Sequence, residues 1–362
     1  MDGDDLYRVV EEYEALGIHR AGTPVDRATF DWYARHLEAF GLTTERSAVP
    51  FDRYDADSTL TADGASIDHL PLFYEWTGSV DTTDVEVAEI DPAGHTFGRS
   101  TGDAPATGER DAAVLATAHP HGSLVASNRE IGDRGGRPTV LVAGRDHRRL
   151  VDATEVRLRL DARLASATTE NLIARNDVAG PPLLLTTPLS GWFQCSGERG
   201  TGAAVLLGLV ERFADHPLLV LATGGHELGY FGVREWVAAG GEPVAAVAHI
   251  GASAACDELG DDGVRRLIAT RVARTDAGGA TADAMQSALQ GANYRFLGAT
   301  DTWVGESEVL CELGVPMLSV TGAGAEFHTP EDHTARVTSP GSLALTCDAI
   351  GDALDALVSS LR

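Results

Sequence analysis

The sequence predicts an α/β fold in which a mostly parallel sheet is covered by helices on both faces. From residue 166 onward, short apolar runs alternate with helical stretches, which is the pattern of parallel strands joined by crossover helices. Residues 55–165 differ, because short strand-like runs alternate there with turns rich in Gly, Asp, Thr and Pro. A mostly β segment is therefore predicted to be inserted ahead of the α/β part.

The α/β part contains four apolar runs of strand length. They are residues 183–187, 218–223, 244–250 and 316–320, and the predicted helices are 201–214, 228–239, 281–291 and 341–360. Ligands of open α/β sheets bind beyond the carboxyl ends of the strands. The polar residues that follow the four runs are therefore candidates for a functional site.

The N-terminal segment is predicted to pack on the α/β part. Residues 5–40 have the apolar spacing of two helices, each ending at a glycine, and residues 41–54 are predicted to form an extended strand. Residues 98–111 are expected to be a surface loop of the insert. The predicted division is therefore 1–54, 55–165 and 166–362.

Composition excludes several classes of partner. The chain has 362 residues and a formal net charge of −26, and all 28 basic residues are arginines. Such a surface repels nucleic acid and anionic membranes, and no run of 18 apolar residues is present. An acidic, lysine-free composition is typical of proteins from salt-loving organisms, although a GC-rich genome alone is an alternative. The N-terminus lacks the features of a signal peptide, so we expect a cytoplasmic location.

The stretch LVLATGGHELGYFG, residues 219–232, places His226 and Glu227 directly after a buried run and two glycines. The HExxH motif of zinc proteases needs a second histidine four residues after the first, so that both face the metal from one helix turn. Tyr230 occupies that position. The motif is therefore excluded, and the His–Glu pair requires another explanation.

Carboxylate and imidazole side chains collect at the same predicted sheet edge. Glu198 follows the first run, His226 and Glu227 follow the second, His249 lies near the end of the third, and His328 follows the fourth. Mixed carboxylate and imidazole ligands suit zinc or a similar divalent ion. Structural roles are the alternative: Glu198 as a favourable charge near a helix N-terminus, His249 as a core histidine, and His328 as a turn residue.

Three further polar residues lie near these motifs. Asp332 and His333 either support a metal ligand by hydrogen bonding or belong to a solvated turn, and the turn is the simpler interpretation. Cys195 is one of four widely spaced cysteines, which we expect to be reduced thiols. Nothing in the sequence indicates that Cys195 has the lowered thiol pKa of a nucleophile.

The order of these motifs resembles the zinc aminopeptidase family that includes leucyl aminopeptidases, glutamate carboxypeptidases and glutaminyl cyclases. SGERGTGAAVLL resembles its DNASGVAALLE element, GGHELGYFG its EELGLLGS element, and VPMLSVTGAGAEFHTPED its terminal YHTxxD element. GIHRAGTP resembles the opening segment, and residues 55–165 resemble the protease-associated domain that many members insert. The resemblance implies metal-ligand positions for Glu198, Glu227 and His328, a position near a further ligand for His249, and the general-base position for His226.

The chain also departs from the family pattern at this edge. TTPLSGW stands where the family has its HxD metal motif, and Ser190 or Leu189 falls near the Asp position. The bridging Asp is replaced by Glu198, and the general-base Glu by His226. These changes imply either a remodelled site with one metal ion or a site that has lost its metal.

We therefore predict a metal-dependent hydrolase of an amide or peptide bond. Its single divalent ion, zinc or a similar metal, would have these protein ligands: Glu198, Glu227, His328 and, as a fourth candidate, His249. His226 would carry the proton from water to the leaving nitrogen, and Arg199 or Tyr230 would stabilise the developing oxyanion.

Two alternatives stay open at this point. One is a two-metal aminopeptidase whose missing ligands are replaced by unidentified residues, and the other is an inactive binding protein with the same fold. The substrate would be a small molecule or a peptide with an amide bond. Four aromatic residues either line its pocket or belong to the core: Trp192, Phe193, Tyr294 and Trp303. The sequence does not indicate the oligomeric state.

Overall fold

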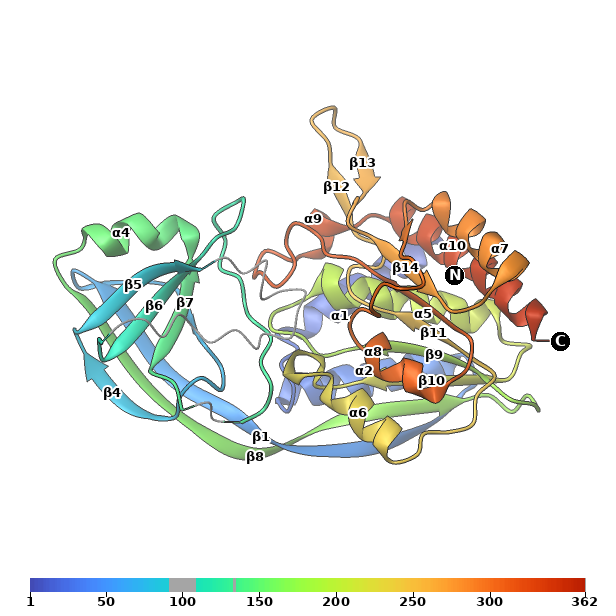
Figure 1. Cartoon of the computed structure of the whole chain (residues 1–362), viewed down its shortest axis with the longest axis horizontal. Coiled ribbons are helices and arrows are strands. Elements are labelled where there is room, and N and C mark those ends of the chain that lie inside the picture. Colours follow the sequence, from blue (N-terminus) through green and yellow to red (C-terminus); the bar gives the residue numbers. More distant parts are fainter. Residues whose placement is uncertain (91–108, 133–134, 362) are drawn as a thin grey trace.

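The computed structural model describes residues 1–90, 109–132 and 135–361. Its main sheet has ten strands in the order β15-β14-β16-β11-β9-β10-β8-β1-β2, with β4 paired to β8 (Figure 1). The strands are β1 (Thr43–Ala62), β2 (Ala65–Ser66), β4 (Gly78–Thr82), β8 (Val156–Arg175), β9 (Leu183–Pro188), β10 (Leu218–Thr223), β11 (Ala246–Ile250), β14 (Val272–Thr275), β15 (Arg295–Phe296) and β16 (Met317–Thr321). All four predicted apolar runs are central strands.

The main sheet is parallel mainly in its centre. Strands β16, β11, β9 and β10 are parallel neighbours. Strand β8 is antiparallel to both β10 and β1, and β14 is antiparallel to β16. The sheet is therefore mixed, and the prediction of a mostly parallel sheet was too simple. The reason is that β1 and β8 lead out to the insert and back again, so they must run in opposite directions.

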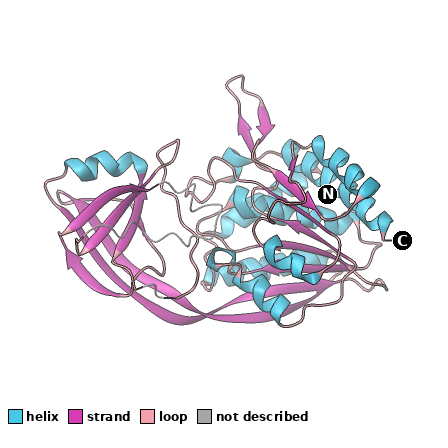
Figure 2. Ribbon diagram, in the orientation of Figure 1, coloured by secondary structure: helices cyan, strands magenta, loops and turns pink. Residues whose placement is uncertain are grey.

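Helices cover both faces of the main sheet (Figure 2). They are α1 (Gly3–Leu16), α2 (Pro24–Ala39), α5 (Thr201–Arg212), α6 (Phe231–Ala238), α7 (Gly279–Gln290), α8 (Ser307–Leu310), α9 (Thr334–Val337) and α10 (Pro340–Ser360). Leu183 and Leu185 of β9 belong to the core that includes α5, whereas Leu184 packs with Trp236 of α6 on the opposite face. This alternation explains the continuous apolar run. Among the described residues, we find no helix with the length and hydropathy of a membrane span.

The N-terminal helices begin at clear capping residues. The side chain of Asp2 accepts the N–H of Asp5 in a capping box, and Thr23 caps α2 ahead of Pro24 at its first turn. Helix α1 packs against α5 and α10, and α2 packs against β1 and β8. Both helices therefore lie on the α/β part, and α1 also contacts the segment that carries Glu198.

The insert forms a separate sheet with the strand order β3-β7-β6-β5. Its elements are β3 (His69–Pro71), β5 (Val85–Ile90), β6 (Ala112–Thr117), β7 (Thr139–Ala143) and α4 (His147–Asp152). Strands β1 and β8 stay paired from Thr43↔Arg175 to Ala62↔Val156 and connect the two parts of the molecule (Figure 1). The predicted boundaries near residues 55 and 165 thus fall inside continuous strands, and the domain division stays a prediction. Most of the predicted loop 98–111 lies outside the described residues.

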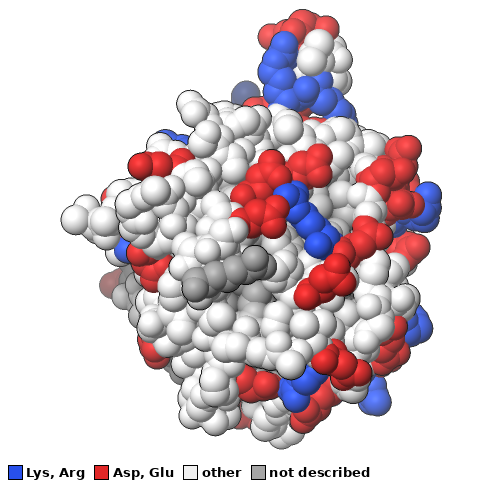
Figure 3. Space-filling view, turned by 90° about the vertical axis from the view of Figure 1, so that its right-hand side faces the viewer, with Lys and Arg blue, Asp and Glu red and all other residues white. Residues whose placement is uncertain are grey.

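Acidic side chains are spread over the surface. Figure 3 shows several groups of Asp and Glu side chains on one face, and the hairpin of β12 (Asp257–Leu259) and β13 (Arg265–Leu267) projects from the α/β part. With a net charge of −26, self-repulsion destabilises the fold at low ionic strength, and salt screens it. We expect the melting temperature to rise by roughly 5 °C or more between millimolar and molar salt. A flat melting temperature would remove the support for a halophilic origin.

Asp26, in the first turn of α2, is a buried carboxyl group with a predicted effect on pH stability. Its Oδ2 accepts hydrogen bonds from the N–H of Gly22 and the hydroxyl of Thr169, each at 2.8 Å. Burial raises the pKa of Asp26 to about 7. The unfolded chain loses this proton near pH 4 and the folded chain keeps it to about pH 7, so the stability contributed by Asp26 falls as pH rises through that window.

Asp26→Asn keeps an oxygen acceptor and removes the titration. In wild type, Asp26 is expected to make the unfolding free energy fall by up to about 1.4 kcal/mol per pH unit. The variant is expected to lack this part of the pH dependence. Urea unfolding curves at several pH values from 4 to 7 measure the slope of unfolding free energy against pH. If wild type and variant have the same slope, Asp26 is ionised in the folded protein throughout this range.

Candidate active site

Ser190 joins the carboxyl ends of β9 and β10 at the predicted site. Its hydroxyl oxygen accepts the N–H groups of Gly225 at 2.9 Å and His226 at 3.2 Å, and the hydroxyl donates to Oε2 of Glu227 at 2.8 Å. Gly225 has a φ of 70°, which allows the sharp turn from β10 into the 3-10 turn His226–Leu228. The turn and the serine together hold the Glu227 carboxylate in the interior, where it is 2% exposed.

Arg199 occupies the centre of the site. Its Nε donates to the carbonyl oxygen of Ser190 at 2.8 Å, and its Nη2 lies 2.8 Å from Oε1 of both Glu227 and Glu198. The side chain is fully buried. Burial opposes the charge of Arg199, but the two carboxylates outweigh burial and raise its pKa. Burial likewise opposes ionisation of Glu198, yet the charges of Arg199 and His328 lower its pKa to about 2.

Asp332 positions Glu198 through the backbone. Its two carboxylate oxygens accept the N–H groups of Gly197 at 2.7 Å and Glu198 at 3.0 Å, within the π-helical turn Ser196–Gly200 that precedes α5. A Cβ at Gly197 would lie 2.8 Å from Oδ1 of Asp332, so this approach requires glycine. Burial raises the pKa of Asp332 to about 7. Asp332 is therefore a buried support of the site rather than part of a solvated turn, whereas His333 pairs with Glu14.

His328 connects the site to the insert. Its Nδ1 lies 3.1 Å from the carbonyl oxygen of Ala126, and its Nε2 lies 3.1 Å from Oε1 of Glu198. A carbonyl oxygen can only accept, so Nδ1 carries a proton. Nε2 then faces Glu198 either as the second N–H of an imidazolium or as a free lone pair. The contact is close enough for an ion pair, although it is not well directed for a hydrogen bond.

His226 has its own carboxylate partner, which the sequence did not indicate. Its Nδ1 lies 3.1 Å from Oε1 of Glu306, a fully buried residue that also accepts the hydroxyl of Thr223. Burial lowers the pKa of His226 to about 3 and raises that of Glu306. Glu306 was missed because it precedes the short helix α8 rather than following a strand. The signal that could have found it is a carboxylate close to apolar residues in WVGESEVL, and Glu308 in the same stretch gives that signal as well.

His249 lies apart from the Arg199 cluster. Its Nδ1 is 3.1 Å from Oγ1 of Thr186 on the neighbouring strand β9, and burial lowers its pKa to about 4. Tyr230 lies beside His226, with 4.9 Å between the ring centroids. Asn128, His226, Tyr230, His249 and Phe327 are among the residues that line a cavity of about 40 Å³. This volume is enough for one or two water molecules.

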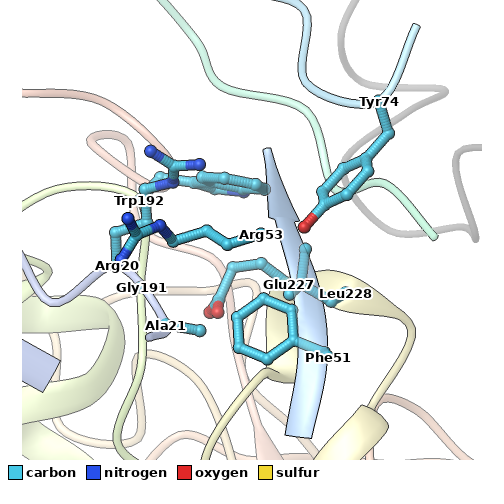
Figure 4. A pocket seen from close by; sticks show the side chains of 9 residues that line it. All are labelled: Arg20, Ala21, Phe51, Arg53, Tyr74, Gly191, Trp192, Glu227 and Leu228. Carbon is cyan, nitrogen blue, oxygen red and sulfur yellow. The ribbon is translucent and has the colours of Figure 1, made fainter. Parts of the chain in front are cut away.

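A second, smaller pocket reaches Glu227 from the side of the insert. Figure 4 shows the Glu227 carboxylate directed into a pocket that Arg20, Arg53, Phe51 and Trp192 also line. Its volume of about 10 Å³ holds about one water molecule. Trp192 lines this pocket and also belongs to the hydrophobic core, so both alternatives left open by the sequence apply to it. Tyr294 is instead a buried core residue, which lies under the guanidinium of Arg271 at 3.9 Å.

The predicted ligands do not fit a metal ion as they are arranged. A zinc ion bound by both carboxylates would lie about 2.0–2.2 Å from each oxygen, and Nη2 of Arg199 occupies that region. Among the described residues, one ligand set has its atoms within 4.8 Å of one another: Cys195, Glu198 and Asp332. Glu198 is the one member of this set among the predicted ligands, and Asp332 also accepts two backbone N–H groups.

Comparisons with known proteins identify the fold. No family model and no curated protein match the chain. Among solved structures, a zinc aminopeptidase from Bacillus subtilis matches with a TM-score of 0.72 at 14% identity, covering 98% of this chain and 94% of that one. A peptidase precursor from Shewanella amazonensis matches with a TM-score of 0.70 at 16% identity, covering 96% and 92%. An aminopeptidase from an Aneurinibacillus species gives 0.63 at 15% identity, covering 98% and 93%.

These matches define the class of fold. The chain has the fold of a zinc aminopeptidase, and the matches cover 96–98% of its length. A fold of this kind can carry different functions, so the function has to be argued from the residues of the site. Here the site residues that the structure brings together are Glu198, Arg199, Glu227 and His328, with His226 beside them on a separate carboxylate.

Proposed function

We propose that this chain is a metal-independent binding protein with the fold of a zinc aminopeptidase. The observation that carries the proposal is the position of Nη2 of Arg199, 2.8 Å from Oε1 of both Glu198 and Glu227. A guanidinium group does not lose its proton in proteins. A divalent ion added beside it would place like charges together in a buried site, where water screens them little.

The charges of the cluster support this assignment. Two buried carboxylates, Glu198 and Glu227, face the guanidinium of Arg199, and Glu198 also faces the imidazole of His328. Arg199 bridges the two carboxylates, and Nε2 of His328 lies 3.1 Å from Oε1 of Glu198. Buried charges are tolerated when they are paired in this way. In this proposal Arg199 supplies the positive charge that a metal ion supplies in a zinc enzyme.

The ligand site of this proposal is the cavity beside the cluster. His226 and His249 present imidazoles to it, and their lowered pKa values keep both neutral at pH 7. Nδ1 of each histidine already has a partner, so each imidazole offers the cavity its Nε2, as a donor or an acceptor according to the tautomer. Oδ1 of Asn128 accepts from Trp192, so Asn128 offers its amide N–H groups, and this combination can bind an amide group. We therefore propose that the protein binds a peptide or another amide-bearing molecule and does not hydrolyse it.

A single-metal amide hydrolase is the second candidate, and one observation favours it. Both carboxylate oxygens of Glu198 and Nε2 of His328 are buried without a well-directed hydrogen bond. A histidine that ligates a metal usually donates its other N–H to a carbonyl or carboxylate, as His328 does to Ala126. This function requires Arg199 to leave its position. His226 would then be the proton carrier, backed by Glu306.

The two functions can be separated by one pair of assays. Peptide and amide hydrolysis is measured with added Zn²⁺, Mn²⁺ or Co²⁺, and binding of amino-acid amides and short peptides is measured by thermal shift. We expect no turnover, together with a thermal shift that survives a chelator and is lost in His226→Ala. His147→Ala, in helix α4 of the insert, is the matched control and should bind like wild type. Turnover that a chelator abolishes and Glu227→Ala removes would reject the proposal in favour of the hydrolase.

A further inference from the structure

Residues 123–130 of the insert cross the candidate site, and we call them the strap. They lie in the connection between β6 and β7, which runs toward the α/β part in Figure 1. Six of the eight residues are buried, and Ala126 is only 1% exposed. Connecting segments normally run over the surface, because buried backbone needs hydrogen-bond partners. The backbone N–H and C=O groups of the strap therefore need hydrogen-bond partners inside the molecule.

Those partners belong to the candidate site. The N–H of Ala126 donates to the carbonyl oxygen of His328 at 2.9 Å, and the Ala126 carbonyl oxygen accepts Nδ1–H of the same residue at 3.1 Å. The N–H of Arg129 donates to the carbonyl oxygen of Glu227 at 3.0 Å, and Oδ1 of Asn128 accepts the indole N–H of Trp192 at 2.9 Å. Extended peptides are recognised by such main-chain hydrogen bonds, with small pockets for alternate side chains.

The strap is also tied to the insert. Arg129 and Glu75 form a buried ion pair at 3.3 Å. Asn128, in the middle of the strap, lines the cavity that His226 and His249 share. The strap thus lies against Glu227 and His328 of the cluster and borders the cavity beside it.

We infer that residues 123–130 are a built-in occupant of a peptide-binding groove. The groove takes an extended peptide with a small residue where Ala126 lies, because that position is fully enclosed. An external peptide binds when the strap leaves its place. This inference rests on the proposed function in that it names the ligand class of the same site, but it does not depend on whether a metal is bound.

The probe for this groove is the strap itself, as a fluorescein-labelled synthetic peptide with the sequence of residues 123–130. Fluorescence polarisation measures its binding to the full-length protein. In Ala126→Pro/Asn128→Ala, proline removes the N–H that bonds His328 and alanine removes the acceptor for Trp192. We expect this variant to bind the peptide at least about tenfold more tightly than wild type. Glu130→Ala, an exposed change at the end of the strap, is the control and should behave as wild type.

A substituted peptide and a hydrogen-exchange measurement complete the test. A peptide with Trp in place of Ala126 is expected not to bind the loosened variant, since the enclosed position has no room for it. Failure of the folded variant to bind the strap peptide, or equal binding by wild type, would overturn the inference. If the double variant does not fold, hydrogen exchange of wild type replaces it. The Ala126 and Arg129 amides are then expected to exchange before those of β9, and exchange only on global unfolding would contradict a releasable strap.

The result of this peptide-binding test can be distinguished from the result of the test of the proposed function. If the protein binds zinc and the loosened variant still binds the strap peptide, the metal-independent function fails and the groove stands. If the protein is free of metal and the variant does not bind the peptide, the groove fails and the metal-independent site stands.

Discussion

Arg199→Ala is expected to lower the free energy of unfolding by about 3–5 kcal/mol and to create zinc binding that the wild type lacks. The loss of stability follows because Glu198 and Glu227 would be left as buried charges without the guanidinium between them. The gain of zinc binding follows because the space of Nη2 then lies open between two carboxylates, with His328 next to Glu198. Urea unfolding with and without zinc measures both effects.

Arg271→Ala is the matched control for this experiment. Arg271 is as deeply buried as Arg199, but its guanidinium donates to the carbonyl oxygen of Ala292 and to Oγ1 of Thr346, which are both neutral. This variant is expected to lose stability without gaining any response to zinc. If zinc raises the unfolding free energy of both variants, or of neither, the assignment of Arg199 to the metal position is contradicted.

Glu198→Gln/Glu227→Gln is expected to have a comparably large effect. The double change keeps the shape of both side chains and leaves Arg199 buried without an anionic partner, which costs about 3–5 kcal/mol. An empty metal site behaves in the opposite way, because neutralising two carboxylates that repel one another stabilises the metal-free protein. The sign of the change in unfolding free energy, measured in the presence of a chelator, therefore separates the two accounts. A stabilised double variant would reject the role of Arg199 as the permanent counter-charge.

Much of the α/β part could be predicted from the sequence, because burial on both faces leaves a clear pattern. The run at residues 218–223 is strand β10 with the same bounds, and the helix predicted at 341–360 is α10 at Pro340–Ser360. The antiparallel flanks could not be predicted in the same way. Strands β1 and β8 are 20 residues long and pair over their whole length, with more than 90 residues of insert between them.

The site was predictable in its residue types and less so in its arrangement. Glu198 and Glu227 both contact Arg199, and His328 contacts Glu198, because all of them follow central strands. The position of Arg199 depends on its χ angles and on the Ser190 carbonyl oxygen, and no spacing rule gives these. A helical residue one position after Glu198 would ordinarily point elsewhere. The π-helical turn Ser196–Gly200, which starts from Cys195 at a φ of 51°, is the local feature that the periodicity did not indicate.

Glu306 and the strap were missed for a different reason. Both act on the site from segments that are remote in sequence: Glu306 from the start of α8 and residues 123–130 from the insert. A search restricted to strand ends cannot find them. Their common signal is a polar or small residue in an apolar context, as in SLVASNRE, which is equally typical of ordinary core segments.

The metal content of the wild-type protein tests the central claim most directly. Protein purified without a chelator is analysed for bound metal and then titrated with Zn²⁺ by calorimetry. The account predicts no stoichiometric metal and no saturable zinc binding at the site, because Arg199 holds the position between Glu198 and Glu227. One equivalent of tightly bound zinc in the wild type, lost in both Glu227→Ala and His328→Ala, would contradict it and establish the single-metal site.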